Sequence, residues 1–134
     1  MSCYYCTDRY RIVVRMAMRD AAIKCLEDSS IYDCWASDRK MNVEVEELGN
    51  GLFSMIPDYS PFSGDWANSG PGDEIAEFLK TYCEPGSYVS QRCDDYFEYS
   101  IYWVNDERKV EEAWQGFQNP YCKFMDKLDE EVFE

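Results

Sequence analysis

The sequence predicts an α+β fold: a ferredoxin-like β-α-β-β-α-β split unit with an antiparallel sheet, both helices on one face, and a C-terminal helical extension. Apolar residues alternate with polar ones in the expected strands and recur at helical spacing in the expected helices, in the order that this unit requires. The 134 residues are enough for one domain with a sizeable core. We place the core at about 10–104 and the extension at about 109–134.

The first strand and the first helix lie near the N-terminus. Apolar and polar residues alternate from Tyr10 to Met18, a pattern typical of a half-buried strand. Asp20 then places a negative charge at the start of a helix whose apolar residues keep helical spacing until Asp28. The segment 31–40 receives no assignment.

A hairpin is the clearest pattern in the chain. Valine and glutamate alternate in a strand over 41–48, which places Glu44 and Glu46 on the face away from the valines. The turn 49–51, Gly-Asn-Gly, supplies the positive φ angles that a tight connection requires. The second strand follows over 52–56.

A loop and a second helix come next. The segment 57–72 is rich in proline and glycine, which predicts a long loop, and its aromatic residues suggest that it packs against the core. Long irregular loops are uncommon in compact domains and are often functional, so this loop is a second candidate site. A helix begins at Asp73, with acids in its first turn, and stops at Glu84-Pro85-Gly86.

The most aromatic stretch runs from Asp94 to Glu107. It predicts a long strand, central in the sheet, that pairs with residues 87–92 through a turn at Asp94-Asp95. Side chains alternate along a strand, so one face, expected to hold the two helices, carries Phe97, Tyr99, Ile101 and Trp103. The other face carries Glu98 and Tyr102 and is expected to be open.

Helical structure is predicted after Asn105. Val110, Ala113, Trp114 and Phe117 recur at helical spacing, although the segment 109–114 could instead extend the sheet. Asn119-Pro120 then provides a cap and a first-turn proline for a terminal amphipathic helix. The opposite face of that helix is strongly acidic.

The chain is strongly acidic, with 27 acidic and 13 basic residues and a formal net charge of −14. Residues 1–40 hold seven basic and six acidic side chains, so the negative charge belongs to residues 41–134. Such a field opposes direct binding to nucleic acid or to anionic membranes, and it favours basic partners or cations. The simpler interpretation is a solvated surface that keeps the protein soluble.

The cysteines and the missing histidine limit the chemistry. Seven scattered cysteines and a start without a signal-peptide pattern favour reduced thiols in a cytoplasm. No run reaches the roughly 18 apolar residues that span a bilayer. Cys3 and Cys6 have the spacing of half a zinc site, but no second ligand pair follows, so neither a metal site nor a cofactor is predicted.

No catalytic motif is present. The chain has no histidine, no G-x-S-x-G, no P-loop, no G-x-G-x-x-G and no EF-hand spacing, which predicts a protein that is not an enzyme and has no catalytic residues. Two alternatives stay open. A ligand-binding or regulatory domain would use the open sheet or the 57–72 loop as a pocket, and a carboxylate-dependent enzyme would use a pair of buried acids, with or without a divalent cation.

The acidic surface is the main candidate site. Spaced carboxylates on rigid elements can imitate the phosphates that a nucleic-acid-binding cleft recognises. The predicted partner-binding residues are Glu44, Glu46, Glu47, Asp94, Asp95, Glu98, Tyr102, Asp106, Glu107, Glu111 and Glu112. The competing interpretation is that Arg11 and Arg15 neutralise the sheet acids through cross-strand ion pairs.

In size and charge the chain resembles the small acidic inhibitors that phages and mobile elements use against restriction or CRISPR machinery. The resemblance implies a non-enzymatic inhibitor in the host cytoplasm that occupies a basic, nucleic-acid-binding protein. It implies no oligomeric state.

Overall fold

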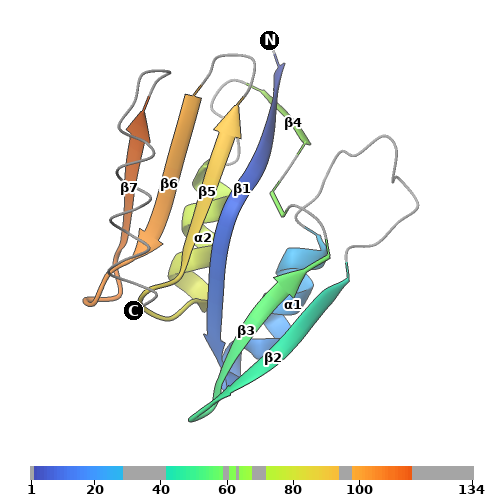
Figure 1. Ribbon diagram of the computed structural model, residues 1–134, viewed down its shortest axis with the longest axis vertical. Coiled ribbons are helices and arrows are strands. Elements are labelled where there is room, and N and C mark those ends of the chain that lie inside the picture. The colour runs from blue at the N-terminus through green and yellow to red at the C-terminus, as the bar shows by residue number, and fades with distance from the viewer. Residues whose placement is uncertain are drawn as a thin grey trace.

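A seven-stranded antiparallel sheet with two α-helices makes up the described part of the chain (Figure 1). The computed structural model describes residues 2–28, 42–58, 61–62, 64–67, 72–93 and 98–115. The elements in chain order are β1 (Ser2–Arg15), the 3-10 helix η1 (Met16–Met18), α1 (Arg19–Glu27), β2 (Val43–Gly49), β3 (Leu52–Pro57), β4 (Gly64–Ala67), α2 (Gly72–Tyr82), β5 (Tyr88–Cys93), β6 (Glu98–Val104) and β7 (Val110–Gln115).

The sheet is built around β1. The strand order is β2-β3-β1-β5-β6-β7, and β4 pairs with the N-terminal part of β1. One edge of β1 pairs with β3, where Ile12 lies opposite Met55, and the other edge pairs with β5, where Tyr10 lies opposite Val89. The prediction that the 94–107 stretch supplies the central strand is wrong, because β6 lies between β5 and β7, next to the sheet edge.

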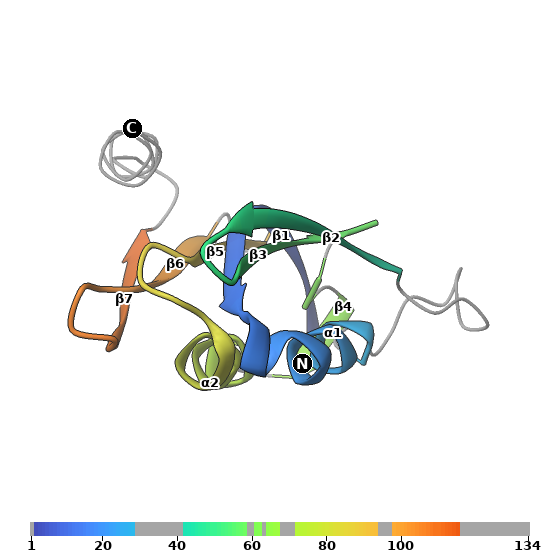
Figure 2. The same cartoon turned by 90° about the horizontal axis from the view of Figure 1, so that it is seen from below.

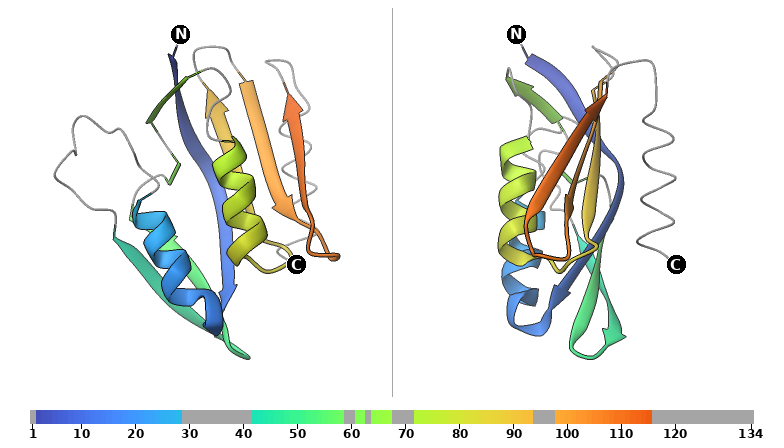
Figure 3. Two further views of the ribbon diagram at one scale, coloured as in Figure 1. Left: turned by 180° about the vertical axis from the view of Figure 1, so that it is seen from behind. Right: turned by 90° about the vertical axis from the view of Figure 1, so that its left-hand side faces the viewer.

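Both helices cover the same face of the sheet, as Figures 2 and 3 show. The core lies between the helices and this face. Its buried side chains come from β1, both helices, β3, β5 and β6 and from two connecting segments: Ile12, Val14, Ala22, Leu26, Phe53, Met55, Phe62, Ile75, Phe78, Leu79, Cys83, Val89 and Val104. The predicted α+β class is confirmed.

Both helices and the hairpin between them agree with the sequence patterns. Helix α1 has Asp20 in its first turn, and α2 has Asp73 and Glu74 in its first turn and Lys80 in its last, charges that complement the helix dipole. The β2–β3 turn has positive φ angles at Gly49, Asn50 and Gly51 (91°, 56° and 75°).

Strand β1 starts earlier and ends earlier than the predicted 10–18. Its N-terminal part pairs with β4 on one side and with β5 on the other, and the register shifts between Thr7 and Arg9. A bulge of this kind breaks the period-two pattern, so the sequence conceals the first half of the strand. Residues 16–18 form η1 instead of continuing the strand.

The sequence predicted a loop over the whole of 57–72. This is wrong for Gly64–Ala67, which forms β4. Pro61 and Phe62, which precede it, are buried. The Thr7 hydroxyl donates a hydrogen bond to the Pro61 carbonyl, and the Gln91 amide donates to the Thr7 hydroxyl (2.6 Å) and the Phe62 carbonyl (3.4 Å). This segment is therefore tied to β1 and β5.

The helix expected from about 109 is a strand over its described part, since β7 pairs with β6 along Val110–Gln115. Asn105 makes the tight turn between them, because its side-chain Oδ1 accepts from the N–H groups of Glu107 (2.9 Å) and Lys109 (3.0 Å). This turn brings the chain back along β6, where the strand ladder satisfies its backbone groups. The predicted terminal helix lies outside the described residues.

Candidate functional site

The β2–β3 hairpin carries the first three predicted acids. Strand β2 pairs only with β3 among the described strands and forms one end of the strand order. Val43 and Val45 pack against the core, so the alternating Glu44 and Glu46 are exposed on the face opposite the helices. Glu47, next to the turn, pairs with the core residue Phe53 and so lies on the same face as Val43 and Val45, but it is exposed.

Exposed apolar side chains accompany these acids. Among the described residues, the large hydrophobic side chains that are exposed are Met16 (64%), Leu48 (45%) and Ile56 (36%). Ile56 lies directly opposite Glu44 in the β2–β3 ladder, and Leu48 follows Glu47. The Met16 N–H donates to the Gly51 carbonyl (3.0 Å), which places Met16 beside the hairpin turn. We call Glu44, Glu46, Glu47, Leu48, Ile56 and Met16 the acidic hairpin surface.

The glutamates of this surface have no ion-pair partner within the described ranges. The ion pairs found there join Arg19 to Asp20, Arg108 to Glu84, and Lys109 to Glu107. Arg15 lies close enough to Glu84 to contribute to lowering the pKa of that carboxyl, after the larger effect of Arg108. Neutralisation of Glu44 and Glu46 by Arg11 or Arg15 is therefore not found.

The remaining predicted acids lie elsewhere. Glu111 and Glu112 are on β7, at the other end of the strand order from β2, and they point to opposite faces of the sheet. Asp106 and Glu107 are exposed in the β6–β7 turn. Asp94 and Asp95 lie outside the described residues, as does the side chain of Glu98. The described acids thus do not form one continuous surface.

The two faces of β6 are the reverse of the prediction. Tyr102 and Val104 pack on the helix side with the core, and the Tyr102 hydroxyl reaches α2 at Gly72. Burial, and then the carboxylate of Glu112, raise the pKa of Tyr102. The two faces carry similar apolar mass, so alternation alone does not show which one meets the helices.

The face of the sheet opposite the helices is not open at β5 and β6. Ile101 of β6 pairs with Ser90 of β5, and Trp103 pairs with Tyr88. Tyr88, Ser90 and Ile101 are 2%, 0% and 1% exposed. The predicted open surface of carboxylates beside tyrosines is therefore absent there.

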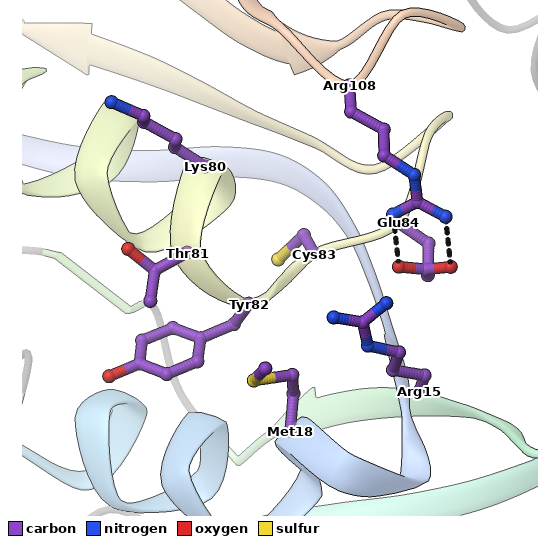
Figure 4. Close-up of a pocket in the computed structure, with 8 residues that line it drawn as sticks. All are labelled: Arg15, Met18, Lys80, Thr81, Tyr82, Cys83, Glu84 and Arg108. Carbon is purple, nitrogen blue, oxygen red and sulfur yellow. Dashed lines mark hydrogen bonds and ion pairs between the residues drawn. The ribbon is translucent and has the colours of Figure 1, made fainter.

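A pocket of about 190 Å³ is a feature that the sequence patterns did not indicate. It is lined by Arg15 at the end of β1 and Met18 in η1, by residues 80–84 at the end of α2 and just after it, and by Arg108 in the β6–β7 turn (Figure 4). These groups are far apart in the chain and have no common spacing. Only the sheet order brings them together.

Two of the described thiols have raised pKa values. Burial raises the pKa of Cys83 far above its ordinary value, and burial followed by the charge of Asp28 raises the pKa of Cys25, so both are protonated at neutral pH. Among described side chains, no three Cys, Asp or Glu residues gather as metal ligands. The Cys3 side chain is outside this set, so the expectation that Cys3 and Cys6 hold no metal stays a prediction.

No protein-family model matches the chain, and neither the curated proteins nor the solved structures contain a significant match. Of the two described helices, neither has the length and apolar character needed to cross a membrane.

Proposed function

We propose that this chain is a non-enzymatic binding protein that engages a basic protein partner through the acidic hairpin surface. The observation that supports the proposal is the coincidence of three glutamates without ion-pair partners, all on one hairpin, with the large hydrophobic side chains that are exposed among the described residues: Leu48 and Ile56 on the hairpin and Met16 beside its turn. Burial of apolar surface is the dominant favourable contribution to most protein association, and charged side chains supply specificity and fast association.

The charge of the chain selects the class of partner. A net charge of −14 attracts a positively charged surface over long range and increases the rate of encounter. Nucleic-acid-handling proteins carry such surfaces, and carboxylates at Glu44 and Glu46 would occupy positions that phosphates otherwise take. The proposed action is therefore inhibition by occupation of a basic nucleic-acid-binding cleft.

The fold supports the hairpin as the contacting element. We infer that β5-β1-β3-β2, with α1 and α2 on one face, is the ferredoxin-like split unit, and that β4, β6 and β7 are additions to it. In this arrangement β2 is an edge strand with a free backbone edge among the described strands. Edge strands accept an added strand from a partner, which would complement the side-chain contacts.

The test is capture of basic proteins from a cytoplasmic extract, quantified for the wild type and two triple variants. Glu44→Lys, Glu46→Lys and Glu47→Lys together change the acidic hairpin surface. The matched control, Glu27→Lys, Glu74→Lys and Glu77→Lys, makes the same change of charge at exposed sites on the helices.

The proposal requires that the hairpin triple variant loses capture while the helix triple variant keeps most of it. Capture by the wild type is also expected to fall steeply with added salt and to be competed by duplex DNA. An equal loss of capture in the two variants would mean that only the net charge of the chain matters and not the position of the acids. Capture that survives in the hairpin variant would refute the proposed surface.

A further inference from the structure

We propose that the pocket between β1, α2 and the β6–β7 turn binds a small anion that carries a carboxylate or phosphate group. Its lining reverses the charge balance of the chain. The whole sequence has 27 acidic and 13 basic residues, yet Arg15, Lys80 and Arg108 line the pocket with Glu84 as the one acid. The lining thus has a formal charge of +2 in a protein that is otherwise strongly negative.

The acid in the pocket, Glu84, already forms an ion pair with Arg108. Arg108 binds Glu84 with both ends of its guanidinium group, Nη1 to Oε2 at 2.8 Å and Nη2 to Oε1 at 3.1 Å. This bidentate pair neutralises Glu84, and the pKa of its carboxyl is held below its ordinary value by the Arg108 hydrogen bonds. An incoming anion would therefore meet a neutral pair rather than a free carboxylate.

Arg15 is the group available to bind the anion. It lies beside Glu84 and contributes a smaller electrostatic effect there, and its side chain has no hydrogen-bond or ion-pair partner in the described part of the chain. Figure 4 shows its guanidinium group on the same side of the pocket as the Glu84–Arg108 pair. A guanidinium group offers two parallel N–H donors, the geometry that matches carboxylate and phosphate oxygens.

The other walls tolerate an anion. The Cys83 thiol is buried and stays protonated at neutral pH, since burial raises its pKa, so it adds no negative charge. The end of α2 contributes the negative end of its dipole, and Lys80 in the last turn offsets it. A volume of about 190 Å³ accommodates a phosphate or carboxylate group with part of its hydration shell, since one water occupies about 30 Å³.

A titration followed by ¹H–¹⁵N NMR tests the site in the full chain. Sodium phosphate and sodium acetate serve as separate probes, each at an ionic strength held constant with sodium chloride. The expected result is saturable shifts that centre on the amides of Arg15, Thr81, Glu84 and Arg108. Shifts with phosphate alone assign a phosphate-bearing ligand, and shifts with both assign the carboxylate class as well.

Two variants separate a built site from a general effect of charge. Arg15→Gln is expected to weaken binding of the probe about tenfold, because one charge-assisted contact is lost. Arg15 is exposed at the end of β1, so the fold does not depend on it. Lys24→Gln removes the same charge from the exposed face of α1 and is expected to leave binding unchanged. Absence of shifts at the pocket, or equal binding by Arg15→Gln and the wild type, would overturn the proposal.

Discussion

Ser87 joins β1 to the α2–β5 connection at the point where the β1–β5 ladder stops. The paired residues of this ladder end at Arg11 and Tyr88, which leaves the backbone of Val13 without a partner on β5. The Ser87 side chain takes that place: the Val13 N–H donates to Ser87 Oγ at 3.1 Å, and the Ser87 hydroxyl donates back to the Val13 carbonyl at 3.3 Å. Both residues are buried, with Ser87 at 0% exposure.

Replacement of Ser87 by alanine removes both hydrogen bonds to Val13 but leaves only one backbone group of Val13 without a partner. The Val13 carbonyl still accepts a hydrogen bond from the Glu84 N–H at 2.8 Å. The Val13 N–H loses its acceptor in a site that water does not reach. One buried, unsatisfied N–H costs about 1–3 kcal/mol of folding free energy.

Equilibrium urea unfolding, followed by tryptophan fluorescence, measures this cost. We expect Ser87→Ala to lower the free energy of unfolding by about 2 kcal/mol with no change in the slope against urea concentration. Ser54→Ala is the control, because Ser54 lies opposite Val13 on β3 and makes no side-chain hydrogen bond in the described structure; its effect should stay within about 0.5 kcal/mol. An equal loss in the two variants would refute the assigned role of Ser87.

Three further predictions concern the surroundings of the pocket and α2. Arg108 has a positive φ of 64°. Arg108→Ala keeps this strained backbone and loses the ion pair with Glu84, whereas Arg108→Gly loses the same pair but relieves the strain. In calorimetry the glycine variant should therefore melt a few degrees higher than the alanine variant. A Cβ at Gly72 would lie 2.6 Å from the Tyr102 hydroxyl oxygen; Gly72→Ala should therefore destabilise the wild type more than it destabilises Tyr102→Phe, with a coupling of about 1 kcal/mol in a double-mutant cycle. The pKa of Glu84 is lowered from its ordinary value of 4.5, so its ionised carboxylate stabilises the fold at pH values above 4.5. The stability advantage of the wild type over Glu84→Gln should therefore shrink as the pH falls below 4.5, and an advantage that stays constant with pH would contradict this prediction.

The hairpin and the two helices were predictable because local patterns determine them. The Gly-Asn-Gly turn at 49–51 needs positive φ angles that few other residues adopt, and its flanking strands alternate in hydrophobicity. Helix α2 has a continuous apolar face between Asp73 and Tyr82. In both cases the pattern in the sequence admits one structure.

Tertiary pairing decided the elements that the sequence assigned wrongly. Val110, Ala113 and Trp114 fit helical spacing, but the Asn105 turn returns the chain along β6 and makes this segment β7. The first half of β1 depends on partners from β4 and β5, and its bulge hides the alternation.

The candidate site was predictable only where it lies within one hairpin. Glu44 and Glu46 point away from the core because Val43 and Val45 point toward it. Whether acids from distant segments meet depends on the strand order, which places Glu111 at the opposite end of the sheet. The pocket around Arg15 has the same origin and no local pattern.

The affinity of a captured basic partner for the hairpin variant measures how much the acidic hairpin surface contributes to the contact. Surface plasmon resonance would compare the wild type, the Glu44, Glu46 and Glu47 to Lys variant, and the variant reversed at Glu27, Glu74 and Glu77. The account predicts that the hairpin reversal raises Kd by about a hundredfold or more, and that the helix reversal changes it far less. A Kd for the hairpin variant within about twofold of the wild type would contradict the account, because such a difference is well below 1 kcal/mol.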